Sequence, residues 1–183
     1  MQSDESIIQH TQNWVRDVIV DLNFCPFAGR EVERDSIRYI IDHANTTEDR
    51  LHHVIDECQH LDKNSTTETT LLLFPTGLDE FDDFLDFIEL AETLLEQQGY
   101  EGTYQLAHFH PYYQFANTAI DDAANYTNRS PYPMLHLIRE TSIEMALKHY
   151  PEPEMIPERN IEHVRKKGKL HMQALLDASK KDN

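Results

Sequence analysis

Cysteine is scarce in this sequence, because Cys25 and Cys58 are the only two among 183 residues. Two cysteines do not make the disulfide framework that stabilises small secreted domains. No apolar run approaches the roughly 20 residues that a helix needs to cross a bilayer. The N-terminus, MQSDESIIQH, has neither the basic nor the apolar region of a signal peptide. These absences predict a cytoplasmic protein with reduced thiols and no membrane contact.

Glycine is also scarce, with five residues in the chain. None of them forms a glycine-rich loop directly after an expected strand. Nucleotide-binding folds of the Rossmann and P-loop types need such a loop to cradle phosphates. The sequence therefore excludes both classes, and it leaves the cofactor unknown.

Positive charge is missing from the middle of the chain. Residues 64–128 contain no Lys or Arg but twelve Asp and Glu, eight of them between Asp79 and Glu96. With a net charge of −17, long-range repulsion argues against a nucleic-acid partner. The acidic run follows a helical pattern and is typical of a solvated helix face. The basic residues gather instead near the C-terminus, between Arg159 and Lys181.

A chain of this length that is 39% hydrophobic can bury a substantial core. We expect one domain, residues 1–183, in which the basic helical segment 157–183 docks only loosely. Hydrophobic periodicity and capping residues predict the following helices: Glu5–Phe24, Thr46 or Thr47 to about Leu61, Asp79 to just before Gly99, Thr141–Tyr150, and a final helix to about Ala178.

Short apolar or β-branched runs predict four strands: Ser36–Asp42, Thr69–Phe74, Thr103–Phe109 and Pro133–Arg139. Strands that alternate with helices favour a sheet covered by helices. We therefore expect an α/β (α+β) fold: a compact two-layer sandwich with a sheet of about four strands, ferredoxin-like in spirit, with extra N- and C-terminal helices.

The segment between His108 and Arg139 is polar but carries few charges. Before the terminal Arg139, Asp121, Asp122 and Arg129 are its charged residues, and glycine is absent, whereas Asn, Tyr, His and Pro are abundant. This composition predicts a rigid loop whose side chains make hydrogen bonds. Loops held in this way are where binding and catalytic sites are commonly built.

Three motifs carry a resemblance to a known family. They are NFCPFA at 23–28, HPY at 110–112 followed by FA at 115–116, and NYTNRSPYP at 125–133 followed by LHL at 135–137 and RE at 139–140. Together they resemble a bacterial family, the domain of unknown function 1415, over nearly the whole chain. The resemblance implies no activity, cofactor or catalytic residue.

Cys25 is the first candidate catalytic residue. It follows a helical pattern and precedes Pro26, a residue suited to the first turn of a new helix. A thiol at a helix N-terminus has a lowered pKa and becomes a nucleophile. The alternative is an inert cysteine that packs as a small hydrophobic residue, which is what we expect for Cys58.

The histidines are the second candidate group. His108 and His110, two residues apart at a strand end, point to one face and would share a metal ion with His136, or with Asp121 or Asp122. No metal-binding spacing supports this arrangement, so a metal site is not favoured. The alternative is that these histidines hold the loop through hydrogen bonds.

Arg129 is the third candidate, since it is the first basic residue after the long acidic span. A guanidinium among amides and hydroxyls binds a carboxylate or phosphate, with Arg139 as a second anchor. Alternatively, Arg129 pairs with Asp121 or Asp122 and pins the loop. The predicted ligand-binding residues are Tyr112, Asn125, Tyr126, Asn128, Arg129, Ser130, His136 and Arg139.

These candidates combine into an enzyme hypothesis for thiol-dependent group transfer or hydrolysis. Cys25 would be the nucleophile, His110 the base, Asp121 or Asn125 its orienting partner, and Arg129 the binding group for a small anionic substrate. Two alternatives stay open. One is a non-catalytic module for a small anionic metabolite. The other is a protein-interaction module that uses the acidic helix or the basic tail.

Overall fold

A four-stranded mixed sheet forms the centre of the protein, in a computed structural model that describes residues 2–148 and 150–181. The strands lie in the order β1-β2-β4-β3, with β1 parallel to β2 and β4 antiparallel to both β2 and β3. Their bounds are β1 Ile37–Ile41, β2 Thr69–Leu73, β3 Tyr104–Phe109 and β4 Met134–Arg139. Each strand lies within its predicted range, and the α+β class with a four-stranded sheet is confirmed.

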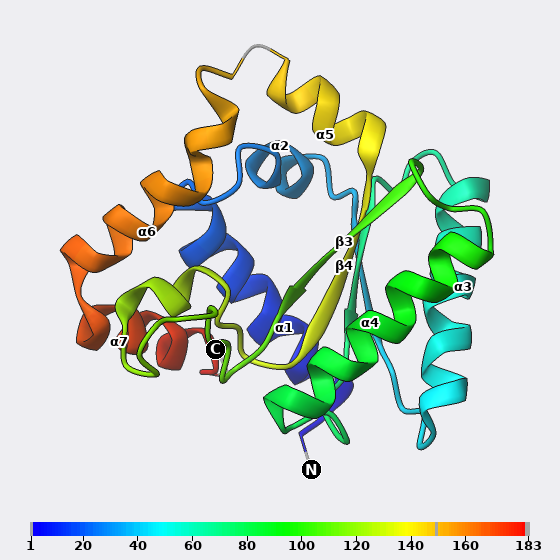
Figure 1. The fold of residues 1–183 in the computed structure, drawn as a ribbon, viewed down its shortest axis with the longest axis horizontal. Helices are drawn as coiled ribbons and strands as arrows, with labels where there is room; N and C mark the ends of the chain where they lie inside the picture. Colours follow the sequence, from blue (N-terminus) through cyan, green and yellow to red (C-terminus); the bar gives the residue numbers. More distant parts are fainter. Residues whose placement is uncertain (1, 149, 182–183) are drawn as a thin grey trace.

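Helices cover both faces of this sheet (Figure 1). Leu71 and Leu73 of β2 belong to one apolar core, whereas Leu72 and the following Phe74 belong to another on the opposite face. The sheet is thus the middle of three layers, where two had been expected. The uninterrupted apolar run 71–74 reflects this, because a strand buried on both faces does not alternate with polar residues.

The first helical layer begins with α1 (Asp4–Trp14), which continues without a break into a π-helical segment, η1 (Val15–Val20). Together they correspond to the predicted helix Glu5–Phe24, which they precede by one residue at the start and fall short of by four at the end. A turn over 21–27 leads to the short helix α2 (Ala28–Glu33). Single π-helical turns are rare and occur frequently at functional sites.

The C-terminal segment belongs to the same layer as two helices, α6 (Ile156–Lys167) and α7 (Lys169–Ser179). The single final helix predicted from the sequence is divided because Gly168 has a φ of +83°, which ends α6. Val164, Met172 and Leu176 of this segment, which was expected to dock loosely, are buried in the core with α1.

The second helical layer consists of α3 (Thr47–Lys63) and α4 (Phe81–Gln97). Thr46 caps α3 by accepting a hydrogen bond from the Asp49 N–H at 3.1 Å, as the sequence predicted. The aspartates and glutamates of α4 lie on its exposed face.

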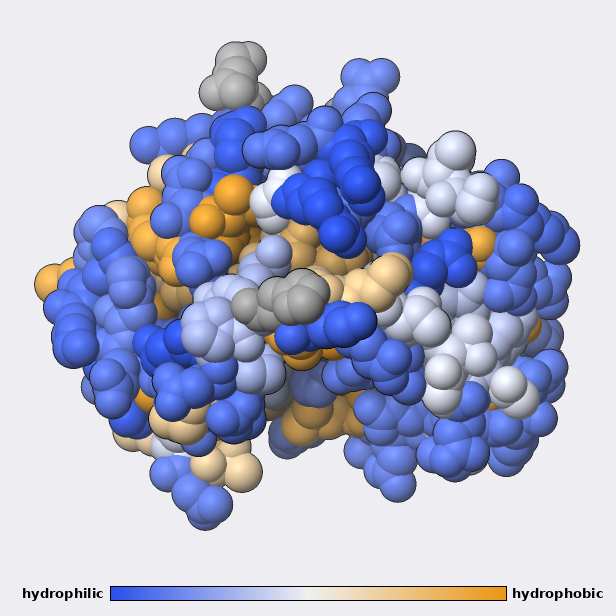
Figure 2. Space-filling view, turned by 90° about the horizontal axis from the view of Figure 1, so that it is seen from above, coloured by the Kyte–Doolittle hydropathy of each residue, from blue (hydrophilic) through white to orange (hydrophobic). Residues whose placement is uncertain are grey.

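Three shorter helices complete the chain: η2 (Ala123–Thr127) in the loop between β3 and β4, then α5 (Glu140–Leu147) and η3 (Pro153–Met155) between β4 and α6. Seen from the α5 side, the surface is mainly hydrophilic, with apolar residues recessed between polar ones (Figure 2). In the described part of the chain, no helix is both long and apolar enough to cross a membrane.

Candidate functional site

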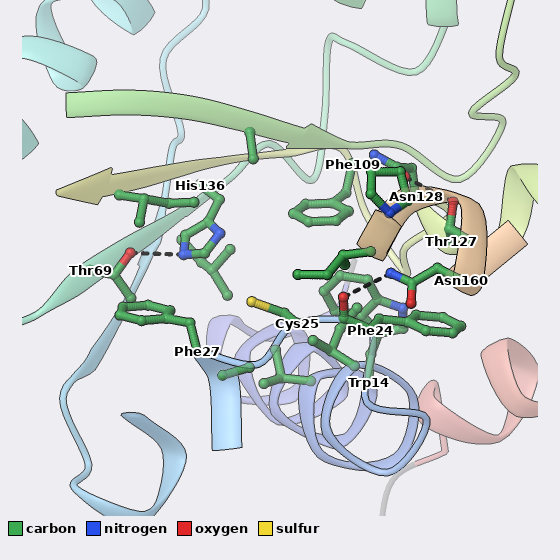
Figure 3. A pocket seen from close by; sticks show the side chains of 18 of the residues that line it. Trp14, Phe24, Cys25, Phe27, Thr69, Phe109, Thr127, Asn128, His136 and Asn160 are labelled. Carbon is green, nitrogen blue, oxygen red and sulfur yellow. Dashed lines mark hydrogen bonds between the residues drawn. The ribbon is translucent and has the colours of Figure 1, made fainter. Parts of the chain in front are cut away.

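A cavity of about 410 Å³ lies between the sheet and the first helical layer (Figure 3). Its walls come from α1 and η1, the turn before α2, the sheet, the β3–β4 loop and the start of α6. Most of the lining is apolar and much of it aromatic: Trp14, Phe24, Phe27, Phe109 and Phe115. Pockets for small molecules are typically of this kind, with a few polar groups set in apolar walls.

Hydrogen bonds fix the turn that carries Cys25. Asn23 adopts the left-handed conformation, with a φ of +53°, directly before the turn. The Phe24 N–H donates to the Ile19 carbonyl at 3.0 Å, and Nδ2 of Asn160 in α6 donates to the Phe24 carbonyl at 2.8 Å. The Cys25 thiol, held between these contacts and α2, projects into the cavity (Figure 3).

The surroundings of Cys25 keep its thiol neutral. Burial raises the pKa of Cys25, and the backbone N–H groups of Phe27 and Ala28 offset this only in part. Cys58 is fully buried, and burial raises its pKa to about 12. Cys25 is therefore accessible from the cavity, but its surroundings do not generate a thiolate.

His136 of β4 is the second reactive group that faces the cavity. Its Nε2 lies 2.8 Å from the Thr69 hydroxyl, which donates its only proton to the Leu137 carbonyl. The Nε2–H of His136 must therefore be the donor to Thr69. In the neutral ring this leaves Nδ1 as an acceptor, and Nδ1 is turned toward the cavity (Figure 3). Burial lowers the pKa of His136 to about 4, so the ring is neutral near pH 7.

Arg129 lies outside the cavity lining and binds its own loop. Its Nε donates to the Tyr113 carbonyl at 3.1 Å and its Nη2 to the Ile120 carbonyl at 2.8 Å. The guanidinium carbon lies 4.6 Å from the centre of the Tyr126 ring. These contacts correspond to a pinning role, although the partners are backbone carbonyls and not Asp121 or Asp122.

Other predicted residues are also engaged in holding the loop. Oδ1 of Asn125 accepts hydrogen bonds from the Phe115 N–H and the Thr118 hydroxyl. The Ser130 hydroxyl donates to the Tyr132 carbonyl. Asp121 is exposed, and Asp122 forms an ion pair with Arg165 at 2.7 Å.

Two predicted ligand-binding residues, Tyr112 and Arg139, do not line the cavity. Tyr112 is 67% exposed. Arg139 donates to the Leu61 and Thr67 carbonyls, at the C-terminal end of α3.

The histidines separate onto the two faces of the sheet. The rings of His108 and His110 lie 6.3 and 5.1 Å from that of Phe84 in α4. His136 pairs across the strands with Ala107, the neighbour of His108, so it points to the other face. Within the described residues, no group of three or more His, Cys, Asp or Glu side chains is placed to hold a metal ion.

His110 is buried, with both ring nitrogens engaged. Nδ1 accepts from the Tyr112 N–H at 3.0 Å, so Nε2–H donates to the Leu78 carbonyl, also at 3.0 Å. Because His110 packs against α4, the structure does not bring it together with Cys25. Of the predicted site residues, the cavity brings together Cys25, Asn128 and His136.

Sequence reasoning missed three polar residues of the cavity: Thr127, which lies within the third motif, and Thr69 and Asn160. Thr69 begins a strand that was predicted from its apolar residues, and it reaches His136 through the β2–β4 register, in which Leu71 is the direct partner of His136. Asn160 lies in the segment expected to dock loosely. Neither Thr69 nor Asn160 has a local signal that marks it.

The chain belongs to the family described as a protein of unknown function (DUF1415), which matches residues 6–174. The resemblance inferred from the three motifs is thereby confirmed. No curated protein and no solved structure matches the chain. The family description names no activity, so the geometry of the cavity has to supply the functional argument.

Arg129→Met is expected to lower the free energy of unfolding by about 2 kcal/mol, because the buried Tyr113 carbonyl and the partly buried Ile120 carbonyl lose a charged donor. Arg165→Met, which removes an exposed ion pair, should change it little. Urea titration followed by circular dichroism measures both values. An Arg129→Met protein as stable as the wild type, but no longer stabilised by added phosphate, would instead make Arg129 an anion anchor.

His136 is expected to make folding sensitive to mild acid. Its folded pKa of about 4 lies below the unfolded value of 6.5, so unfolded chains bind more protons between these pH values. Stability should therefore fall as pH drops from 6.5 toward 4, with His136 contributing at most about 2 kcal/mol between pH 7 and pH 5. Urea titrations at both pH values should show a smaller loss in His136→Gln. The matched control, His171→Gln at an exposed site, should behave as the wild type, and an equal loss in all three proteins would contradict this expectation.

Proposed function

We propose that this protein binds a small, predominantly apolar molecule in the cavity between the sheet and the N-terminal helix. The observation that carries this proposal is the cavity itself, whose volume of about 410 Å³ falls within the range of about 300–1,000 Å³ that is typical of small-molecule sites. Its aromatic walls favour a ligand with a flat apolar body. Partial exposure of Cys25 and His136 supports access from solvent.

The charge of the lining favours an uncharged ligand. Among the described residues, no Lys, Arg, Asp or Glu lines the cavity. An anion there would lose its hydration without gaining a cation, which is costly in an apolar site. The anionic substrate expected from the sequence therefore finds no support in the lining, whereas the expected small-molecule function does. The cytoplasmic location predicted from composition remains part of this proposal.

A bulky side chain that fills the cavity should weaken the binding of an apolar dye. N-phenyl-1-naphthylamine, an uncharged dye that fluoresces in apolar surroundings, is expected to bind the wild type with one site per chain. Ala107→Phe places a ring in the cavity beside His136 and should weaken binding by about tenfold or more. Leu170→Phe, at a site that is 87% exposed, is the matched control and should bind as the wild type. Circular dichroism checks that both variants fold, and undiminished binding by a folded Ala107→Phe protein would refute the proposal.

A second candidate function is thiol-dependent chemistry in the same cavity. It is favoured by one observation, that the Cys25 thiol and Nδ1 of His136 face the same space (Figure 3). In this version His136 takes the role that the sequence assigned to His110. It accepts the proton from the thiol as Cys25 attacks an electrophilic carbon of the ligand, and it returns that proton to the leaving group as the bond between that carbon and the leaving group breaks. The raised pKa of Cys25 means that such activation would require the ligand in place.

Alkylation with N-ethylmaleimide separates the two candidates. For a binding protein, Cys25 should react more slowly at pH 7 than free cysteine, because burial raises its pKa. The bound dye should slow the reaction further, and Cys58 should not react in the folded chain. Mass spectrometry of Cys25→Ser and Cys58→Ser proteins assigns each rate. A Cys25 rate above that of free cysteine, reduced in His136→Gln, would favour the enzyme.

A further inference from the structure

The polar side chains of the cavity differ in whether their hydrogen-bonding groups are engaged within the protein or face the cavity. Four of these side chains donate to backbone carbonyls: Nε1 of Trp14 to Arg129 at 3.0 Å, the Thr127 hydroxyl to Ala124 at 3.0 Å, Nδ2 of Asn128 to His108 at 3.3 Å, and Nδ2 of Asn160 to Phe24 at 2.8 Å. Cys25 offers only a weak S–H donor. Nδ1 of His136, by contrast, is an acceptor that faces the cavity (Figure 3).

The state of His136 is set by two neighbours on the sheet. The Thr69 hydroxyl donates its only proton to the Leu137 carbonyl, so toward His136 it can only accept, from Nε2–H. Both neighbours are part of the β2–β4 ladder and are buried. The tautomer is thus determined by the sheet before any ligand arrives, and the lone pair on Nδ1 is preorganised.

We propose that the ligand carries an uncharged hydroxyl group that donates a hydrogen bond to Nδ1 of His136, so that the cavity selects phenols or alcohols over their ethers and over carboxylates. This inference rests on the proposed small-molecule function and specifies the ligand class. A carboxylate would present its oxygens to the Nδ1 lone pair and find no cation. An ammonium group would donate, but the described lining holds no carboxylate to balance its charge.

Thr69 acts in this scheme as a positioning residue. Without its hydroxyl, Nε2–H of His136 loses its acceptor, and the proton is free to move to Nδ1. The ring would then present a donor to the cavity for part of the time. Thr69→Val should therefore weaken the preference for a hydroxyl, whereas Thr69→Ser, which retains the hydroxyl, should preserve it.

The test compares 2-naphthol with 2-methoxynaphthalene and 2-naphthoate as competitors of N-phenyl-1-naphthylamine at pH 7. For the wild type we expect 2-naphthol to bind about tenfold more tightly than the ether, since one buried hydrogen bond separates them, and the carboxylate to bind most weakly. This preference should disappear in His136→Leu, shrink in Thr69→Val and persist in Thr69→Ser.

A direct readout of the tautomer needs no ligand. Long-range ¹H–¹⁵N correlation spectra of the wild type should show Nε2 of His136 protonated and Nδ1 unprotonated at pH 7. A protonated Nδ1 would overturn the inference, and so would equal binding of the naphthol and its ether. In both cases the dye still binds and the proposed function stands. If neither the dye nor any naphthalene binds, the proposed function itself fails. Should His136→Leu not fold, the two Thr69 variants still decide the question.

Discussion

The hydrogen bonds of Arg129 hold together the parts of the protein that surround the cavity. Its guanidinium donates to the carbonyls of Tyr113 and Ile120, on the far side of the same loop. Its own carbonyl accepts from Trp14 in α1. Tyr126, whose ring lies against the guanidinium, donates to Gln173 in α7. A buried charge must be paired in this way, and the pairing makes the loop a rigid wall.

The placement of the charged residues explains how a strongly acidic protein has a cavity lined by uncharged side chains. The net charge of −17 comes from residues that lie largely on the surface, as on the outer face of α4. The guanidinium of Arg129, within the polar loop, donates to backbone carbonyls, and Arg129 does not line the cavity. What remains there is a set of aromatic walls, a neutral thiol and a neutral imidazole. The cavity is therefore suited to recognise shape and one hydrogen bond.

Local patterns were sufficient for the four strands, for the longer helices up to α4 and for part of the site, but not for the division of the C-terminal segment into α6 and α7. Apolar runs predicted all four strands, and Thr46 marked the start of α3, because these signals depend on neighbouring residues alone. Cys25, Asn128 and His136 were singled out, and all three line the cavity. Arg129 was predicted to bind an anion, with pinning of the loop through Asp121 or Asp122 as the alternative. Its partners in the structure are backbone carbonyls, which no residue pattern reveals.

The sequence by itself determined the four strands, the longer helices up to α4, the family and the polar loop, since each of these depends on patterns of neighbouring residues. Only the tertiary structure decided which of them meet. The β3–β4 register sends His108 to one face of the sheet and His136 to the other. The β2–β4 register brings Thr69 to His136 across 67 positions of sequence. Strand register therefore decides both the sheet face on which His136 lies and the tautomer of its ring. Register arises from pairing between segments that are distant in the sequence, so local patterns do not reveal it.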